Sequence, residues 1–279
     1  MVSFRNSQFQ AIIWGLVIAD TLSHGQSPWA LLGPTVACPS SIDKSVGAIT
    51  DDRWSHAIAT QCTLLSETNQ SFSPQSWPVL DDGTEPTSTV PASVPNLLVT
   101  LPRLLAQLDR CLVPPVSGAV TEGVEASIVT AFRKVLKVCL RQDKVALRDL
   151  QQPLQPAPPE TLLPSQTALC QAIEVVLAAQ GDFQLVVGQS LQSSATALGV
   201  PVLAGVLSAS WGDLPSLPTH YRHWLYQPPP DLQVWLQRRW QITTGTELDA
   251  WSASLWRHWT GCPLGPVGRS LTVAVVPPS

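Results

Sequence analysis

The stretch from Phe183 to Gly212 contains no Asp, Glu, Lys or Arg, and this uncharged run constrains the fold more than any other part of the sequence. It fits an apolar helix, a loop of small residues and a second helix over about Gly199 to Trp211. Pro201 falls in the first turn of that second helix, where a missing N–H costs no hydrogen bond. The second helix also carries a face of small side chains, made by Ala204, Gly205, Ser208 and Ala209. Small side chains let a neighbouring helix approach closely, so we expect this helix to be central and buried on most of its circumference.

The composition agrees with a chain that buries much of its surface. Hydrophobic residues make up 44% of the 279 residues, and charged residues only 13%, against a usual quarter. This length is enough for one large domain or two small ones. Apolar residues recur at helical spacing in four segments, which we expect to form helices: 8–22, 97–112, 121–150 with a break near Asp143, and a segment that starts at a predicted N-cap, Ser165.

We predict a single all-α domain over residues 1–279, built as a multi-helix orthogonal bundle. Three segments differ from the helices in composition. They are a Ser-, Thr- and Pro-rich loop at 66–95, a Pro-rich connector at 151–164 and a Trp-rich C-terminal section at 219–279.

The C-terminal section holds more than half of the eleven tryptophans: Trp224, Trp235, Trp240, Trp251, Trp256 and Trp259. One interpretation is a helical cap docked on the core. The other is a surface for a protein partner, because Trp and Arg are favoured interface anchors and Arg238, Arg239 and Arg257 lie among the tryptophans. We predict that the tryptophans that are exposed contact a protein partner.

The charge distribution argues against nucleic acid as a partner. The net charge is −4, and phosphate binding needs clustered Lys and Arg. One basic cluster occurs in the helix at 121–150, and it comprises Arg133, Lys134, Lys137, Arg141 and Lys144. We interpret it as a solvated helix face, with an anionic docking patch as the alternative.

The N-terminal helix at 8–22 has a rival interpretation. Arg5, the apolar run from Ala11 to Ala19 and the sequence Val17-Ile18-Ala19 also fit a secretory signal over residues 1–19, which would make the protein secreted. The apolar run is too short to span a bilayer, so no membrane span is predicted. We favour the structural helix and a cytoplasmic location.

The six cysteines are scattered and form no C-x-x-C pair, so no zinc site is predicted. Cys139 and Cys170 fall on apolar helical faces and are expected to be buried free thiols. This pattern is typical of a reducing compartment.

Residues 182–218 resemble the C-terminal part of the ADP-ribosylglycohydrolase family. That family has Asp-Phe and an apolar run, then Gly-Gly-Asp-Thr-Asp-Thr, then a helix reading roughly Ile-Ala-Ala-Ile-Ala-Gly-Ala-Leu-Ala-Gly. Here Asp182-Phe183, the run from Val202 to Leu207 and the exit from Gly212 to Pro218 follow the same order. The opening segment from Gly15 to Leu22 is similar to the family's Gly-Leu-Ala-x-Gly-Asp-Ala-Leu-Gly, and Asp20 stands at its aspartate.

The resemblance implies an all-α fold and, in complete members, magnesium-dependent hydrolysis of ADP-ribosyl bonds. Thr50, Asp51 and Asp52 match the Thr-Asp-Asp that supplies half of a two-metal site. Hard oxygen ligands suit magnesium, and a pair of ions can activate a water. The residues alone equally favour a helix start, with Thr50 or Asp51 as N-cap and Asp52 complementing the helix dipole.

The other half of the metal site is absent from this sequence. When the chain is anchored on Ala204-Gly205, the family's two metal-binding aspartates fall on Thr196 and Leu198, and its ligand threonine falls on Gly199. Neither Thr nor Leu can replace an anionic ligand.

Three hypotheses about function follow. The first is a non-catalytic relative of that family that acts as a binding or scaffolding module, with no catalytic or cofactor-binding residue. The second is a metal-dependent hydrolase of ADP-ribosyl bonds whose site is rebuilt with other carboxylates, such as Asp20 or Asp182, and which retains magnesium. The third is a secreted helical protein of unrelated function. No G-x-S-x-G elbow, P-loop or dinucleotide-binding glycine motif occurs, and His220 and His223 are interpreted as surface or cap residues.

Overall fold

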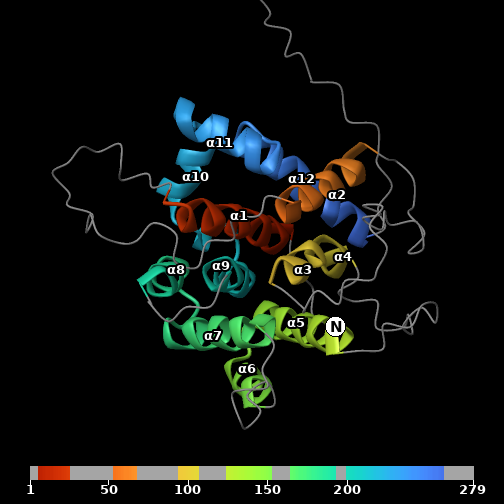
Figure 1. Cartoon of the computed structure of the whole chain (residues 1–279), viewed down its shortest axis with the longest axis vertical. Coiled ribbons are helices and arrows are strands. Elements are labelled where there is room, and N and C mark those ends of the chain that lie inside the picture. The colour runs from red at the N-terminus through yellow and green to blue at the C-terminus, as the bar shows by residue number, and fades with distance from the viewer. Residues whose placement is uncertain are drawn as a thin grey trace, which may run out of the picture.

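The computed structural model describes residues 6–25, 53–67, 94–106, 124–152, 164–192 and 199–260. Every regular element in these ranges is helical, which confirms the predicted all-α class (Figure 1). The α-helices are α1 (Asn6–Ser23), α2 (Arg53–Glu67), α3 (Val94–Val99), α4 (Leu101–Ala106), α5 (Val124–Leu140), α6 (Lys144–Gln151), α7 (Pro164–Ala178), α8 (Phe183–Gln192), α9 (Val200–Trp211), α10 (Thr219–Tyr226), α11 (Pro230–Trp240) and α12 (Gly245–Thr260), and η4 (Leu214–Ser216) is a short 3₁₀ helix. None of the helices in the described ranges is long and apolar enough to cross a membrane.

Helix α9 lies at the centre of the bundle, as predicted. It packs against α1 on one side and α7 on the other, with α8 beside it (Figure 1). All of its residues are buried. Gly199 precedes the helix with a φ of 80°, a backbone conformation that glycine adopts without steric cost, and Pro201 lies in the first turn.

The small residues of α9 let α1 approach closely. Gly15 of α1 lies next to Ala209, and Gly205 lies next to Ala19, so the two helices run antiparallel. A Cβ added to Gly205 would collide with the Cβ of Ala19 and lie 3.2 Å from the carbonyl oxygen of Gly15. Backbone contact at this point therefore requires glycine at position 205.

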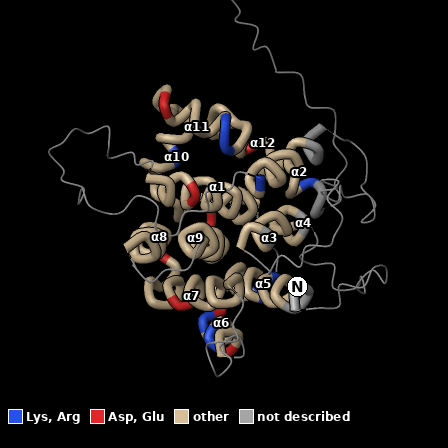
Figure 2. Tube along the Cα trace, viewed as in Figure 1, with Lys and Arg blue, Asp and Glu red and all other residues tan. Residues whose placement is uncertain are grey.

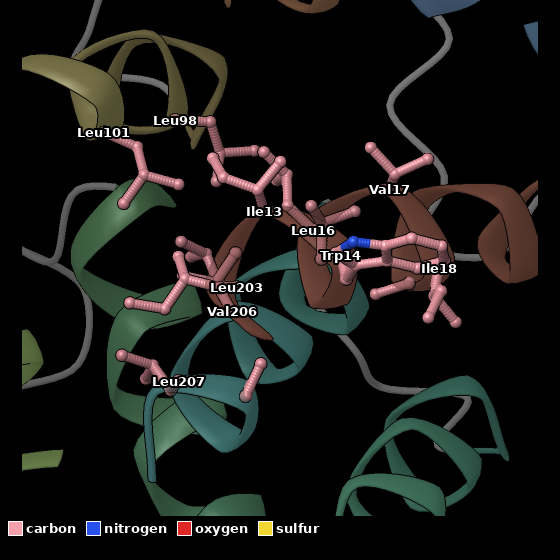
Figure 3. Packing of buried hydrophobic residues seen from close by; sticks show 14 of the residues in the cluster. Ile13, Trp14, Leu16, Val17, Ile18, Leu98, Leu101, Leu203, Val206 and Leu207 are labelled. Atoms are coloured by element: carbon pink, nitrogen blue, oxygen red, sulfur yellow. The ribbon is translucent and has the colours of Figure 1, made fainter. Parts of the chain in front are cut away.

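Helix α1 is buried on nearly every side, as a helix in the middle of a globular core must be. Figure 3 shows Ile13 of α1 beside Leu98 of α3, with Leu203 and Val206 of α9 below them. All of these side chains belong to one contiguous cluster of buried hydrophobic residues. The C-terminal helices α10, α11 and α12 cover α1 on the side away from α9 (Figure 1).

Two local predictions need correction. The helix expected at 97–112 is two short helices, α3 and α4, which meet at Thr100. Pro102 cannot donate a backbone hydrogen bond to the preceding turn, so a continuous helix is interrupted there. Ser165 is not an N-cap, because α7 already begins at Pro164 and Ser165 is fully buried. Residues 107–112 lie outside the described ranges.

The predicted break near Asp143 is confirmed. Asp143 is the N-cap of α6, and its Oδ1 accepts a hydrogen bond of 3.0 Å from the backbone N–H of Ala146. Such a cap stabilises a helix start by about 1 kcal/mol. The chain therefore turns at the end of α5 and starts a separate helix.

Candidate functional site

The most unusual polar group in the described structure is the carboxylate of Asp20, on the last turns of α1. Its side chain is fully buried. Arg239 donates from Nη2 to Oδ1 and from Nε to Oδ2, both at 3.1 Å. Trp240 donates from Nε1 to Oδ2 at 2.9 Å. Both carboxylate oxygens are therefore already engaged by donors from α11.

This ion pair is almost entirely removed from water. The Arg239 residue is only 2% exposed. Burial raises the pKa of the Asp20 carboxyl above its ordinary value, and the charge and hydrogen bonds of Arg239 oppose that rise. A buried charge is tolerated only when it is paired and hydrogen-bonded, so each partner depends on the other.

The first turn of α2 holds Arg239 from the other side. The ring of Trp54 lies 5.2 Å from the guanidinium carbon, within the range of a cation–π contact. Trp54 also meets Trp240 edge to face, with ring centroids 5.3 Å apart. Ser55 donates from Oγ to the carbonyl oxygen of Arg239 at 2.8 Å, and His56 Nε2 lies 2.7 Å from the carbonyl oxygen of Arg238.

His24 connects this buried pair to the surface. Its Nδ1 lies 2.9 Å from the carbonyl oxygen of Asp20 and 3.5 Å from Oδ1 of the same residue. The ring packs near Trp235 of α11, with centroids 5.6 Å apart. The His24 side chain is 18% exposed, so it is the partly solvated end of the cluster.

Among the described residues, Asp20 is the one predicted metal-site residue that lies in this cluster. Asp20 lies at its centre, but Thr50, Asp51 and Asp52 lie outside the described residues, as do Thr196 and Leu198. Helix α2 begins at Arg53 and reaches Arg239 through Trp54. Because α1 and α9 run antiparallel, the C-terminal end of α1 meets the N-terminal end of α9.

The second proposed ligand, Asp182, does not join Asp20. It is exposed at the start of α8, and its Oδ1 accepts a hydrogen bond of 2.9 Å from the backbone N–H of Leu185. The adjacent Gly181 lies against Trp211, at the C-terminal end of α9 and so at the opposite end from Asp20. The two carboxylates therefore lie at opposite ends of the contact between α1 and α9 and do not share one site.

Within the part of the chain that the structure describes, no group of three or more His, Cys, Asp or Glu side chains is arranged to hold a metal ion. Asp20 also fits that role poorly, because its buried carboxylate is already paired with the guanidinium of Arg239. His220 and His223 lie on α10, half-buried and exposed respectively.

The described tryptophans of the C-terminal section are buried or partly buried, so none of them is an exposed residue of the kind that the predicted partner contact requires. Trp224, Trp240 and Trp251 are buried. Trp235 and Trp256 are partly buried and pack against the core, and Trp256 meets Phe9 of α1 edge to face. The side chain of Trp259 lies outside the described residues. The alternative interpretation, a cap docked on the core, accounts for all five described tryptophans.

A second carboxylate cluster joins the same two parts of the chain, and sequence reasoning missed it. Asp249 of α12 accepts a hydrogen bond of 3.0 Å from Nε1 of Trp14 and one of 2.7 Å from the hydroxyl of Tyr226. Burial and the hydrogen bond to Asp249 raise the pKa of Tyr226 to about 12. An aspartate of α1 therefore accepts a hydrogen bond from Trp240 of α11, and Trp14 of α1 donates one to an aspartate of α12. No local pattern marks such pairs, because Trp14 and Asp249 are 235 positions apart.

Comparisons with protein-family models, with curated proteins and with solved structures found no match. The resemblance to the ADP-ribosylglycohydrolase family therefore rests only on the residues quoted above.

Proposed function

We propose that this protein is a non-catalytic, ADP-ribosylglycohydrolase-like helical protein that acts as a binding or scaffolding module. The observation that carries the proposal is the guanidinium of Arg239 on both oxygens of Asp20. In the resemblance, Asp20 is the aspartate of the opening helix. Here that aspartate already has a fixed cation as its partner.

Electrostatics explains why this arrangement opposes metal chemistry. Two unit positive charges 5 Å apart repel by about 3 kcal/mol at an effective dielectric constant of 20, and a divalent ion doubles that figure. A magnesium ion bound beside Asp20 would have to overcome this repulsion or displace Arg239. Together with Thr196 and Leu198 at the positions of the family's aspartates, the ion pair favours a protein that keeps the helical frame without its reaction.

A metal-dependent hydrolase is the second candidate. It is supported by the contact of the first turn of α2 with Arg239, and by the antiparallel packing that directs the C-terminal end of α1 towards the start of α9. These segments are next to the family's site positions. Such an enzyme would have to draw its ligands from Asp51 and Asp52, with others in place of Thr196 and Leu198.

A release assay separates the two candidates. The whole chain is incubated with a mono-ADP-ribosylated protein and magnesium or manganese, and free ADP-ribose is measured. The proposal predicts release at the uncatalysed rate and no rise in melting temperature with either metal, since a ligand stabilises only the state that binds it. Turnover that Asp51→Asn abolishes, while Asp149→Asn leaves it intact, would establish the hydrolase instead.

A further inference from the structure

The positive charge of this acidic chain is concentrated in one short segment. Residues 133–149 hold six of its sixteen Lys and Arg but only two of its twenty Asp and Glu, which makes the segment +4 in a chain of −4. The six basic residues are Arg133, Lys134, Lys137, Arg141, Lys144 and Arg148. They lie on α5, on α6 and on the turn between them. The rest of the chain is correspondingly more acidic, so this segment is the part that attracts anions.

Helix α6 presents the end of this segment to solvent. It projects from the bundle beyond α5 and α7 (Figure 1), and Figure 2 shows basic positions along it. Leu147 is its only fully buried residue. We define the α6 face as the exposed residues Lys144, Val145 and Arg148 of α6, together with the exposed Arg141 of the turn that precedes the helix.

The α6 face is not neutralised within the described part of the chain. Arg141, Lys144 and Arg148 form no salt bridge there, and neither does the exposed Lys134 of α5. Of the two nearby acids, Asp143 is used as the N-cap of α6 and Asp149 lies at the edge of the face. The cations are therefore available to a partner.

The α6 face also carries an apolar side chain. Val145 is 70% exposed, the largest exposed fraction of any large hydrophobic side chain that the structure describes. Among the residues that the structure describes on α5 and α6, no exposed aromatic side chain accompanies the basic residues, as stacking on nucleic acid bases would require. A projecting helix with cations around one apolar side chain suits a broad, flat, anionic surface better than an extended chain that must lie in a groove.

We propose that the α6 face binds the surface of a membrane that contains anionic phospholipids. Lys and Arg near such a surface each contribute about 1 kcal/mol, or roughly five-fold in partitioning. One valine adds too little apolar area to anchor the protein, so binding is peripheral, reversible and weakened by salt. This inference does not depend on the function proposed for the protein from the Asp20 site.

Vesicle co-sedimentation tests the proposal with the whole chain. At low salt, the wild type is expected to sediment with vesicles of phosphatidylcholine and phosphatidylserine but not with phosphatidylcholine alone. Lys144→Gln and Arg148→Gln should each reduce the partition coefficient roughly five-fold, and together on the order of twenty-fold. Arg238→Gln is the matched control, because it removes an exposed positive charge from α11, and it should change binding less than two-fold. Unchanged helical circular dichroism verifies that each variant is folded.

The outcomes decide between membrane and other anionic partners. No sedimentation of the wild type with anionic vesicles at low salt overturns the proposal, as does an equal loss in Arg238→Gln. Tighter binding to poly-aspartate or to RNA than to vesicles of equal charge also overturns it, and would assign the face to a soluble anion. Loss of vesicle binding confined to the α6 variants supports it.

Discussion

Asp20 and Arg239 form an ion pair that is almost completely buried. Replacing one member of a buried ion pair leaves the other charge uncompensated, which typically costs about 3–5 kcal/mol. We therefore expect Asp20→Asn to lower the free energy of unfolding by that amount in a urea titration. Asp149→Asn, on the exposed side of α6, should change it by less than about 0.5 kcal/mol.

A double variant separates the energetic cost of an unpaired buried charge from the cost of lost packing. Asp20→Asn combined with Arg239→Met removes both charges, so its free energy of unfolding should exceed that of Asp20→Asn alone. A single Asp20→Asn variant within 1 kcal/mol of the wild type would show that the pair is solvated and that the account of this site is wrong.

The buried thiols provide a second prediction at the residue scale. Cys62, Cys139 and Cys170 are free and buried, as the sequence predicted for the last two. Burial raises the pKa of Cys62 and Cys139 to about 12, and only the thiolate reacts rapidly with alkylating reagents. In the native protein, labelling of these two residues by iodoacetamide should stay slow from pH 7 to pH 9 and become fast in denaturant, as measured by peptide mass spectrometry. Rapid native labelling of Cys139 at pH 7 would contradict its burial against α9.

At the scale of elements, the contact between α1 and α9 depends on glycine at one point. Gly205→Leu should lower the free energy of unfolding by at least about 1–3 kcal/mol, because the added side chain must displace Ala19 and the backbone of α1. Gly188 of α8 is the matched control, since a Cβ added there meets nothing within 4 Å. Gly188→Ala should raise stability by about 0.5–1 kcal/mol through helix propensity. Thermal unfolding of both variants measures the contrast, and equal melting temperatures for Gly205→Leu and the wild type would exclude a close approach of the helices.

The elements that the sequence predicted are those whose signals are local. Helix α9 was predicted from its uncharged run and from Pro201 in its first turn, and the break between α5 and α6 was predicted near Asp143. These signals act within a few positions, so periodicity and turn chemistry were enough to find both features. The break at Thr100 was not predicted, although Pro102 lacks the backbone N–H that a continuous helix would need there. The pairing of Asp20 with Arg239 could not be predicted, because 219 positions separate them and only the packing of α11 on α1 brings them together.

Exposure of an aromatic residue is likewise a property of the fold and not of the local sequence. A tryptophan cluster is compatible with a core and with an interface, because the same large apolar ring is favoured in both. Leu248, Trp251 and Leu255 stand at helical spacing on α12, and all three are buried. The burial of Trp240, in contrast, depends on α1, which lies far away in the sequence.

At the scale of the whole molecule, the C-terminal helices belong to the same packed core as α1. Trp240 and Trp14 each donate to a carboxylate on the other side of this contact. Unfolding followed by tryptophan fluorescence and by far-ultraviolet circular dichroism should therefore give one transition with the same midpoint. A fluorescence transition at clearly lower denaturant would instead indicate that the tryptophan section opens as a separate unit.

The central proposal is that this protein is not a two-metal hydrolase, and that Asp20 is held by Arg239 and not by a metal ion. Equilibrium dialysis of the whole chain against manganese, with the bound metal counted by atomic emission, tests it most directly. The account predicts less than one tightly bound ion per chain for the wild type, with no change in Asp51→Asn. Two ions per chain, lost in Asp51→Asn, would contradict it.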